Sequence, residues 1–397
     1  MFNKIKYGIL SLVIIGALNC QKAEQHIMIT NVPKDISIDV PTEIPPGSVP
    51  LTSDFFKVQS GEVGFLLQQA PAIFSADDET MQRTFCTILP ADVKAGEWAL
   101  SPGSGNPILT FRDDKQRGRL HVLENDKPVL TYNYGMQLAP GVPEDRRRST
   151  YIHPVNDLRG NSLTDDFPKD HYHHRGLSWM WPHVTIDGKD YNLWHIQGVK
   201  QIFEKWLAQE DGPVCATLGV KNAWRLDDRK VMDEWVWVRV FRATDIARVI
   251  DIRLTWKALE PIRLLGAEKK GYGGLCFRIA PRQQTIITTP AGIEESDSNQ
   301  KRYPWADESG IFGSSSDFSG VAIFQHQTNP DFPAGWCLRH YGFLGVNWPG
   351  LEPFTVLPGK PLTMRFRIYV HNGDAGQGMV KEAYKVFKNS PILSLGR

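Results

Sequence analysis

Two stretches decide the fold class of this protein, VIDIRLTW at residues 249–256 and LTMRFRIYVH at residues 362–371. In both, an apolar side chain stands at every second position with a mostly polar side chain between. A period of two is typical of a strand with one face on a core, because successive side chains of a strand point to opposite faces. The stretch EWVWVRVFR at residues 234–242 predicts a third strand, and residues 119–134, with Asn-Asp-Lys in the middle, predict a hairpin.

The composition extends this pattern to the whole chain. The 397 residues include 34 Gly, 27 Pro and 12 Trp, which favours many short strands joined by tight turns. A helical period is confined to residues 378–388, and no repeat of about 20–50 residues is visible, which disfavours propellers and solenoids. The sequence predicts an all-β protein, a large antiparallel β-sandwich with a short C-terminal helix.

The N-terminus has the pattern of an export signal. Lys4 and Lys6 precede an apolar run at residues 8–18, which is shorter than the about 20 residues that span a bilayer. The run ends at Cys20 and resembles the lipobox of bacterial lipoproteins, in which the Cys is acylated. We therefore expect a lipoprotein-type signal peptide at residues 1–20 and a lipid-anchored protein of the bacterial cell envelope, facing the periplasm or the cell surface. A soluble exported protein cleaved nearby is the alternative.

The rest of the chain divides into a spacer and a folded part. Residues 21–53 are polar and carry five prolines, so we interpret them as a linker. Residues 54–397 are predicted to form a single β-sandwich domain, in which residues 54–115 could form a small β subdomain.

Charge and cysteine content argue against a nucleic-acid partner and against a ribbon-type zinc site. Lys and Arg number 45 against 44 Asp and Glu, and no basic run is interleaved with aromatic residues, so nucleic acid is not an expected partner. No CxxC occurs, which excludes a ribbon-type zinc site. The four cysteines after Cys20 could form one or two disulfides in an oxidising compartment, but we favour free core thiols. They are Cys86, Cys215, Cys276 and Cys337.

Strand alternation fades between residues 140 and 198, where His, Arg, Asp and Trp crowd together. A long irregular connection in a compact domain is usually functional or disordered, and its Trp content argues against disorder. At its centre stands Asp170-His171-Tyr172-His173-His174-Arg175-Gly176. This segment is the candidate site.

Three interpretations of the histidines remain open. In an extended segment His171 and His173 would share a face and could chelate a metal, although no established ligand spacing is present, and we assign no metal. Alternatively, imidazoles act as general acid and base on a sugar, with Arg175 binding an anion, Trp faces stacking on the ring and carboxylates accepting hydroxyl protons. That interpretation uses His171, His173, His174 and Arg175 as catalytic residues, and Asp165, Asp166, Asp170, Trp179, Trp181, Trp194 and His195 as ligand-binding residues. Finally, the histidines could hydrogen-bond to one another and the Trp residues could pack in the core, in which case the segment is structural and not a functional site.

Other catalytic motifs are missing. The chain has no GxSxG, no GxxxxGK[ST] and no GxGxxG after a strand, so nucleophile-elbow, P-loop and dinucleotide sites are unsupported. The Gly-rich run at residues 271–274 is expected to allow a bulge or a close approach of backbone. Tyr272 within it is a candidate proton carrier for β-elimination.

Several segments together resemble a known family. DFPKDHYHHRGLSWMW, IDGKDYNLW, YIHPV, YPWADESGIF, GVAIFQHQTNP and GWCLRHYG are similar to the PmoA-like proteins, an uncharacterised family labelled as methane oxygenase. The resemblance spans residues 115–370. It implies a fold like the galactose-mutarotase supersandwich and a carbohydrate ligand. The same motifs nominate additional ligand-binding residues, namely His153, His326, Arg339 and His340.

The sequence therefore predicts an exported protein that binds or transforms a carbohydrate or another small molecule, by epimerase, lyase or glycoside-hydrolase-like chemistry and without a cofactor. A non-catalytic glycan-binding lipoprotein is one alternative. A metal-dependent oxygenase or hydrolase that uses the same histidines as ligands is the other.

Overall fold

The computed structural model describes residues 25–32, 37–74 and 82–396. The expected signal peptide and Cys20 lie outside these residues. Strands dominate the described chain, and α1 (Val380–Lys388) is the single α-helix in it, so the predicted all-β class with a short C-terminal helix is confirmed. No helix among these residues is long and apolar enough to span a bilayer.

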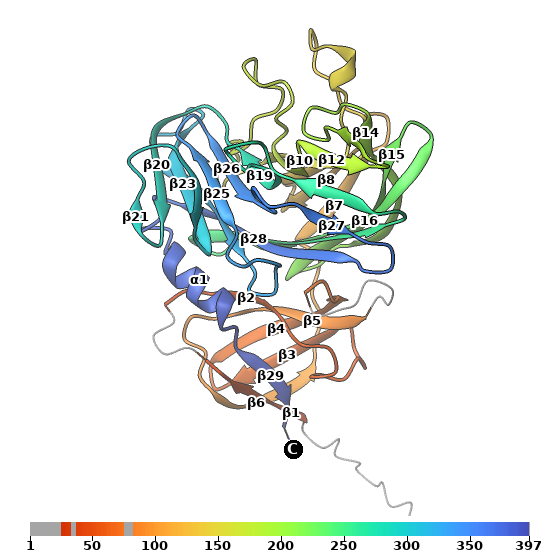
Figure 1. Cartoon of the computed structure of the whole chain (residues 1–397). Helices are drawn as coiled ribbons and strands as arrows, with labels where there is room; N and C mark the ends of the chain where they lie inside the picture. Colours follow the sequence, from red (N-terminus) through yellow and green to blue (C-terminus); the bar gives the residue numbers. More distant parts are fainter. Residues whose placement is uncertain (1–24, 33–36, 75–81, 397) are drawn as a thin grey trace, which may run out of the picture.

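The large unit is a β-sandwich of two nine-stranded sheets (Figure 1). The long-stranded sheet contains all three stretches that were predicted to be strands, and β17 pairs antiparallel with β28 through Ile252 opposite Phe366. In order, its strands are β14 (Val199–Glu210), β15 (Cys215–Leu226), β16 (Arg229–Phe241), β17 (Ala247–Ala258), β28 (Leu362–Asn372), β24 (Phe318–Gln325), β23 (Trp305–Phe312), β20 (Arg282–Thr289) and β21 (Gly292–Ile293).

The second nine-stranded sheet carries the predicted hairpin, whose turn residues Asn125 and Asp126 have positive φ. In order, its strands are β22 (Ser298–Arg302), β25 (Gly335–Arg339), β26 (Phe343–Asn347), β19 (Gly274–Arg278), β11 (Leu177–Met180), β10 (Tyr151–Val155), β9 (Lys127–Asn133), β8 (Arg119–Glu124) and β7 (Leu109–Asp114). A four-stranded sheet, β13 (Lys189–Tyr191), β12 (His183–Ile186), β18 (Ile262–Leu265) and β27 (Phe354–Val356), completes the unit.

A buried carboxylate organises the sandwich core. Glu234 on β16 is fully buried and accepts hydrogen bonds from five side chains. Because only donors surround it, both of its oxygens act as acceptors, as in an ionised carboxylate. The donors are the indole Nε1 atoms of Trp179, Trp224 and Trp256 at 3.1, 2.8 and 2.8 Å, Gln201 Nε2 at 3.0 Å and Asn222 Nδ2 at 2.9 Å.

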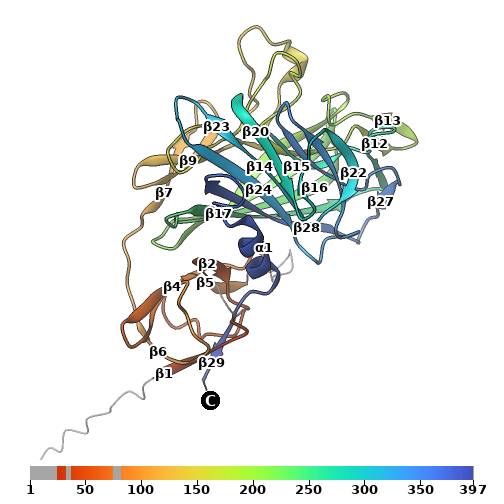
Figure 2. The same ribbon diagram turned by 90° about the vertical axis from the view of Figure 1, so that its left-hand side faces the viewer.

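A seven-stranded sheet forms a second unit beneath the sandwich (Figures 1 and 2). Its strands, in order, are β2 (Val40–Glu43), β5 (Arg83–Leu89), β4 (Val63–Pro71), β3 (Phe55–Ser60), β6 (Gly96–Pro102), β1 (Gln25–Thr30) and β29 (Ile392–Leu395). The interpretation of residues 21–53 as a linker is therefore wrong for the described residues from Gln25 onward. Ile27 and Ile29 are fully buried in this unit, because β1 lies between β6 and β29.

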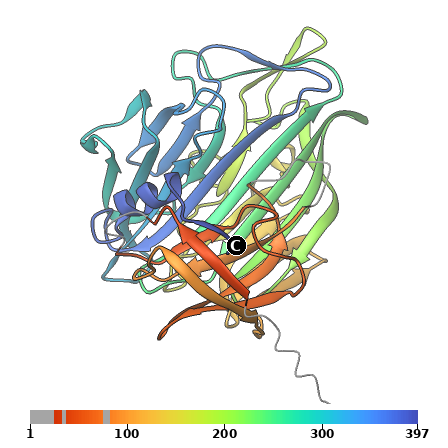
Figure 3. The same ribbon diagram turned by 90° about the horizontal axis from the view of Figure 1, so that it is seen from below.

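The suggested subdomain at residues 54–115 has different bounds. The unit also contains β1 and β2, and β29 reaches it from the C-terminal end of the chain. Figure 3 shows this unit against the long-stranded sheet, with α1 beside it. Both ends of the described chain thus belong to the same small sheet.

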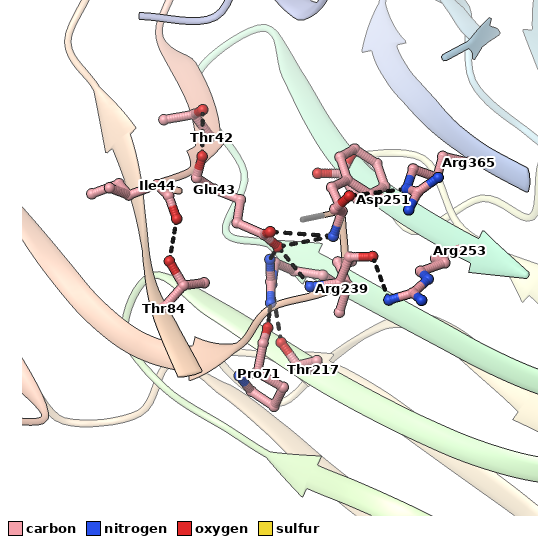
Figure 4. A network of polar contacts seen from close by, with 12 residues as sticks. Thr42, Glu43, Ile44, Pro71, Thr84, Thr217, Arg239, Asp251, Arg253 and Arg365 are labelled. Carbon is pink, nitrogen blue, oxygen red and sulfur yellow. Dashed lines mark hydrogen bonds and ion pairs between the residues drawn. The ribbon is translucent and has the colours of Figure 1, made fainter. Parts of the chain in front are cut away.

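Polar side chains join the two units (Figure 4). Arg239 on β16 is buried; its Nη1 lies 2.5 Å from Glu43 Oε2, and its Nη2 donates to the carbonyl oxygen of Pro71. Cys86 on β5 and Cys215 on β15 hydrogen-bond each other across this boundary. All four described cysteines are free and buried, as predicted.

Candidate functional site

A cavity of about 280 Å³ collects most of the histidine cluster; we call it the histidine cavity. Four loops build its wall: the turn before β11, the segment after β13, the connection between β18 and β19, and the β25–β26 hairpin. In Figure 1 the loops that precede β11 project on the side of the sandwich away from the seven-stranded sheet. The lining residues are His171, His173, His174, Trp194, His195, Lys270, Tyr272, Cys337, Arg339, Tyr341 and Phe343.

The histidine segment is a tight double turn and not the extended chain that a same-face pair would require. The amide of His171 donates to Pro168 O at 3.0 Å, and the amide of His174 donates to His171 O at 2.9 Å. This curvature places the imidazoles of His171, His173 and His174 on one cavity, where an extended chain would have turned His174 to the other face.

Arg175 stabilises this turn through hydrogen bonds to backbone carbonyl oxygens. Its side chain is fully buried, its Nη2 donates to Arg146 O at 2.6 Å, and its Nη1 donates to the carbonyl oxygen of Tyr172. The guanidinium lies 3.1 Å from the ring centroid of Phe167. Gly176 follows with φ +36°, and a Cβ there would lie 2.3 Å from Ile152 O, so the chain needs glycine to pass this point.

The imidazoles pack directly against one another. The ring centroids of His173 and His195 lie 4.2 Å apart and nearly parallel, and those of His171 and His174 lie 4.7 Å apart. His173 and His174 meet edge to face at 4.5 Å. Of the four, His171 has a carboxylate partner, with 2.8 Å between its Nδ1 and Asp170 Oδ2.

Burial and positive neighbours keep the rings of His173, His174 and His195 neutral. Burial, together with the charges of His195 and of other cations nearby, lowers the pKa of His173 to about 3. Burial likewise lowers the pKa of His174 far below its usual value, and burial and the charges of Arg146 and Arg148 lower that of His195. A neutral imidazole has one donor and one acceptor nitrogen, so it can hydrogen-bond in both directions, and its acceptor nitrogen is unprotonated at neutral pH.

Two of the histidines have ring nitrogens without a hydrogen-bond partner in the described structure. His174 is 4% exposed, and its Nδ1 has no hydrogen-bond partner among the described residues. No ring hydrogen bond joins His173 to any described residue either. A buried polar atom without a partner is costly, so a ligand or water that hydrogen-bonds to it is favoured.

Aromatic rings close the other side. Trp194 packs on Tyr272 with ring centroids 4.8 Å apart, and Phe343 stacks on His174 at 5.2 Å. Tyr341 stacks on His171 at 5.8 Å. Burial raises the pKa of Tyr272 and brings that of Tyr341 to about 12, so both phenols keep their protons. Within the described ranges, no group of three or more His, Cys, Asp or Glu is arranged to hold a metal ion.

The family follows from the sequence comparison. The profile of a family of unknown function, DUF6807, matches residues 119–385, about two thirds of the chain and most of the sandwich. The chain belongs to this family. No curated protein matches the DUF6807 chain.

Solved structures that match the chain include two Enterococcus faecalis proteins and one from C. elegans. A glycosyl hydrolase family 38 protein from Enterococcus faecalis aligns with TM-score 0.50 and 9% identity over 94% of the DUF6807 chain and 47% of its own. An α-mannosidase from Enterococcus faecalis V583 aligns with TM-score 0.47 and 9% identity over 94% and 46% of the two chains. A GalM/aldose epimerase homologue from C. elegans aligns with TM-score 0.28 and 9% identity over 68% and 99%.

These matches show likeness of fold alone. The DUF6807 chain spans about half the length of the two Enterococcus faecalis proteins, and the TM-scores below 0.5 carry no argument. None of these comparisons is to a PmoA-like protein, so that resemblance stays a sequence-based prediction.

Several residues nominated from the sequence lie away from the histidine cavity. Trp179 and Trp181 are fully buried in the core, the first on Glu234 and the second with its Nε1 donating to Trp348 O at 2.7 Å, so they offer no face to a ligand. Arg175 supports the turn and is likewise inaccessible. The prediction that Arg175, Trp179 and Trp181 contact a ligand is wrong. A segment without strand or helix periodicity can still bury its side chains in the core.

The remaining histidines have other surroundings. His153 Nδ1 lies 2.9 Å from Thr164 Oγ1, and burial lowers its pKa to about 4. His326 lines a separate pocket beside Phe74 and Phe387, near the seven-stranded sheet. His340 forms an ion pair with Asp297.

The three nominated aspartates are paired with arginines. Asp165 and Asp170 form ion pairs with Arg278, and Asp166 pairs with Arg175. Burial raises the pKa of Asp166 to about 6, although Arg175 opposes this. None of the three lines the histidine cavity as the structure describes it.

Sequence reasoning missed four lining residues. Lys270, Cys337, Tyr341 and Phe343 come from separate loops that only the fold brings together. The feature of the sequence that could have pointed to Lys270 is the Gly-rich run at residues 271–274, which follows it directly. A Cβ on Gly271 would lie 1.9 Å from Gln300 Nε2, which confirms the expected close approach.

Proposed function

We propose that the histidine cavity binds a carbohydrate and transforms it by acid–base catalysis. The observation that carries this proposal is that the imidazoles of His173, His174 and His195, with unpartnered nitrogens on His173 and His174, line one cavity together with aromatic side chains. A sugar ring offers hydroxyl groups to the nitrogens and an apolar C–H face to the rings. The likeness of fold to a family 38 glycosyl hydrolase supports this choice of ligand class.

The lining favours lyase or epimerase chemistry over glycoside hydrolysis. Most glycosidases act with a pair of Asp or Glu residues that flank the bond. No Asp or Glu lines the histidine cavity within the described residues. Imidazole and phenol groups suit proton abstraction from carbon, with His173 as base and the protonated Tyr272 as acid.

His173→Ala is expected to abolish turnover while leaving the fold intact. General acid–base groups contribute about 10²–10⁴-fold to rate, whereas His173 is partly exposed, so its removal is expected to change stability by about 0.5 kcal/mol or less. The measurement is mass-spectrometric detection of products from a panel of polysaccharides, together with thermal melting. His183→Ala, on a strand outside the cavity, is the matched control.

The outcomes separate the alternatives. Glycan binding without turnover in the wild type would favour a non-catalytic glycan-binding protein. Stoichiometric zinc, copper or iron in protein purified without added metal, lost in a His171→Ala/His173→Ala double variant, would favour the metal-dependent oxygenase or hydrolase. Turnover unchanged in His173→Ala would refute the assignment of the base.

We also propose that the protein is exported and anchored through acylated Cys20. The apolar run at residues 8–18 that leads to Cys20 supports this proposal. Labelling with a radioactive fatty acid is expected to mark the wild type and not Cys20→Ser. A mature protein that begins at another residue and carries no label would contradict it.

A further inference from the structure

Lys270 presents an ammonium group to the histidine cavity from a fixed backbone. Its carbonyl oxygen accepts hydrogen bonds from Gln300 Nε2 at 2.7 Å and Asn347 Nδ2 at 3.3 Å. Its amide donates to Glu268 O at 2.7 Å. The side chain is exposed, and no ion pair joins its Nζ to a carboxylate in the described part of the chain. The chain thus places a cation at the cavity without neutralising it.

Arg339 supplies a second cation in the wall. Its Nη1 donates to the carbonyl oxygens of Ser298 and Leu338 at 2.8 and 2.9 Å, and its Nη2 donates to Asn299 Oδ1 at 2.6 Å. These acceptors hold the guanidinium in place but carry no charge. Asp297 forms an ion pair with Arg339 Nε at 3.9 Å, which offsets part of the guanidinium charge.

Two further arginines near the wall add to the positive field: Arg148, which is buried, and Arg146, which is half-buried and forms an ion pair with Asp145. Arg148 donates to the carbonyl oxygens of Leu193 and Trp194, which are uncharged. Arg146 Nη1 donates to His195 O at 2.8 Å. Charges act more strongly in a protein interior than in water, and no carboxylate among the described residues lines the cavity. An anionic ligand would be attracted to such a site.

From this arrangement we infer that the ligand is a uronic acid residue of a glycan, whose carboxylate binds at Lys270. The inference rests on the proposed acid–base function, because it explains how an imidazole could remove a proton from carbon. Neutralising the carboxylate acidifies the adjacent C5–H bond. A sulfate ester would be attracted by the same charges, but it does not acidify a carbon in this way.

The reaction is a β-elimination that needs no further reactant. His173 takes the C5 proton, the electrons of that bond form the C4–C5 double bond, and the C4–O4 bond breaks. Tyr272 gives its proton to the leaving oxygen, and water returns the proton from the imidazolium to the phenolate. Trp194 packs against both groups, with its ring centroid 6.4 Å from His173 and 4.8 Å from Tyr272.

Calorimetric titration of the full chain with three sets of oligosaccharides tests the inference: uronate-containing, carboxyl-reduced, and sulfated without uronate. The wild type is expected to bind the uronate set at least tenfold more tightly than the other two, and more weakly at high salt. Lys270→Met is expected to lose at least tenfold in affinity for uronates, whereas Lys270→Arg keeps most of it. Lys360→Met, at an exposed lysine away from the cavity, is the control.

Each other result has one meaning. If carboxyl-reduced oligosaccharides bind as tightly, or Lys270→Met has no effect, the uronate inference is wrong while the proposed sugar site stands. Preference for the sulfated set also overturns it. If no glycan binds and none is converted, the proposed function itself fails. Ultraviolet absorbance of the new double bond reports elimination independently of binding.

Discussion

Replacing Glu234 by leucine is expected to leave no folded protein. Five buried N–H donors converge on this carboxylate, three of them from tryptophan indoles. Each buried donor without an acceptor costs about 1–3 kcal/mol, and more when the lost acceptor was charged. Their sum is comparable with the about 5–15 kcal/mol by which a whole domain is stable. Soluble expression, circular dichroism and urea unfolding measure the effect.

Glu234→Gln is the matched control for this prediction. A glutamine keeps one oxygen for the indoles and presents an amide where Asn222 now donates. Asn222 Oδ1 is buried and has no hydrogen-bond partner among the described residues, so a flip of Asn222 would supply an acceptor. We expect a folded variant with reduced stability. If Glu234→Leu melted close to the wild type, the indole cluster would not be what organises the core.

Arg175→Ala is expected to destabilise the protein by about 3–5 kcal/mol, the usual cost of breaking a buried ion pair. The change removes donors from the carbonyl oxygens of Tyr172 and Arg146 and leaves Asp166 without its cation. A large loss of stability is expected because Arg175 is buried and does not line the histidine cavity, in contrast to the catalytic residue that the sequence predicted. Urea unfolding measures the difference.

Variants in the core and in the histidine cavity give reference values for the loss of stability in Arg175→Ala. Ile252→Ala and Phe366→Ala, on adjacent core strands, are expected to cost about 2–5 kcal/mol because each opens a cavity. His173→Ala is expected to melt near the wild type. If Arg175→Ala melted near the wild type as well, the buried position of the guanidinium would be wrong.

The strands of the large sandwich could be predicted from local sequence pattern, because a strand with one apolar face repeats apolar residues at every second position. The alternation at residues 249–256 and 362–371 gives one buried and one solvated or paired face, and the two stretches are neighbours in the sheet. The short helix was visible for the same reason, since Val380, Ala383 and Phe387 recur on one buried face. Periodicity shows which face of one element is apolar; that the polar face of β17 is buried as well, with Asp251 paired to Arg367, is decided by the contacts around it.

The seven-stranded unit could not be predicted in this way. β1 is only six residues long, and it is stable as a strand because β6 and β29 provide its hydrogen bonds and the core of the small unit covers Ile27 and Ile29. One of these partners comes from residues 392–395, about 360 positions away. A proline-rich composition says nothing about such a pairing.

The candidate site likewise has one feature that the sequence determined and others that only the fold decided. The sequence determined that histidines cluster at residues 171–174, because neighbours in the chain stay neighbours in space. Which groups share a cavity was decided by the fold: the double turn brings His174 to the same side as His171, and separate loops add Lys270 and Tyr341. The fold also buried Arg175 and Trp179, because chain without a period leaves the direction of a side chain to the contacts that surround it.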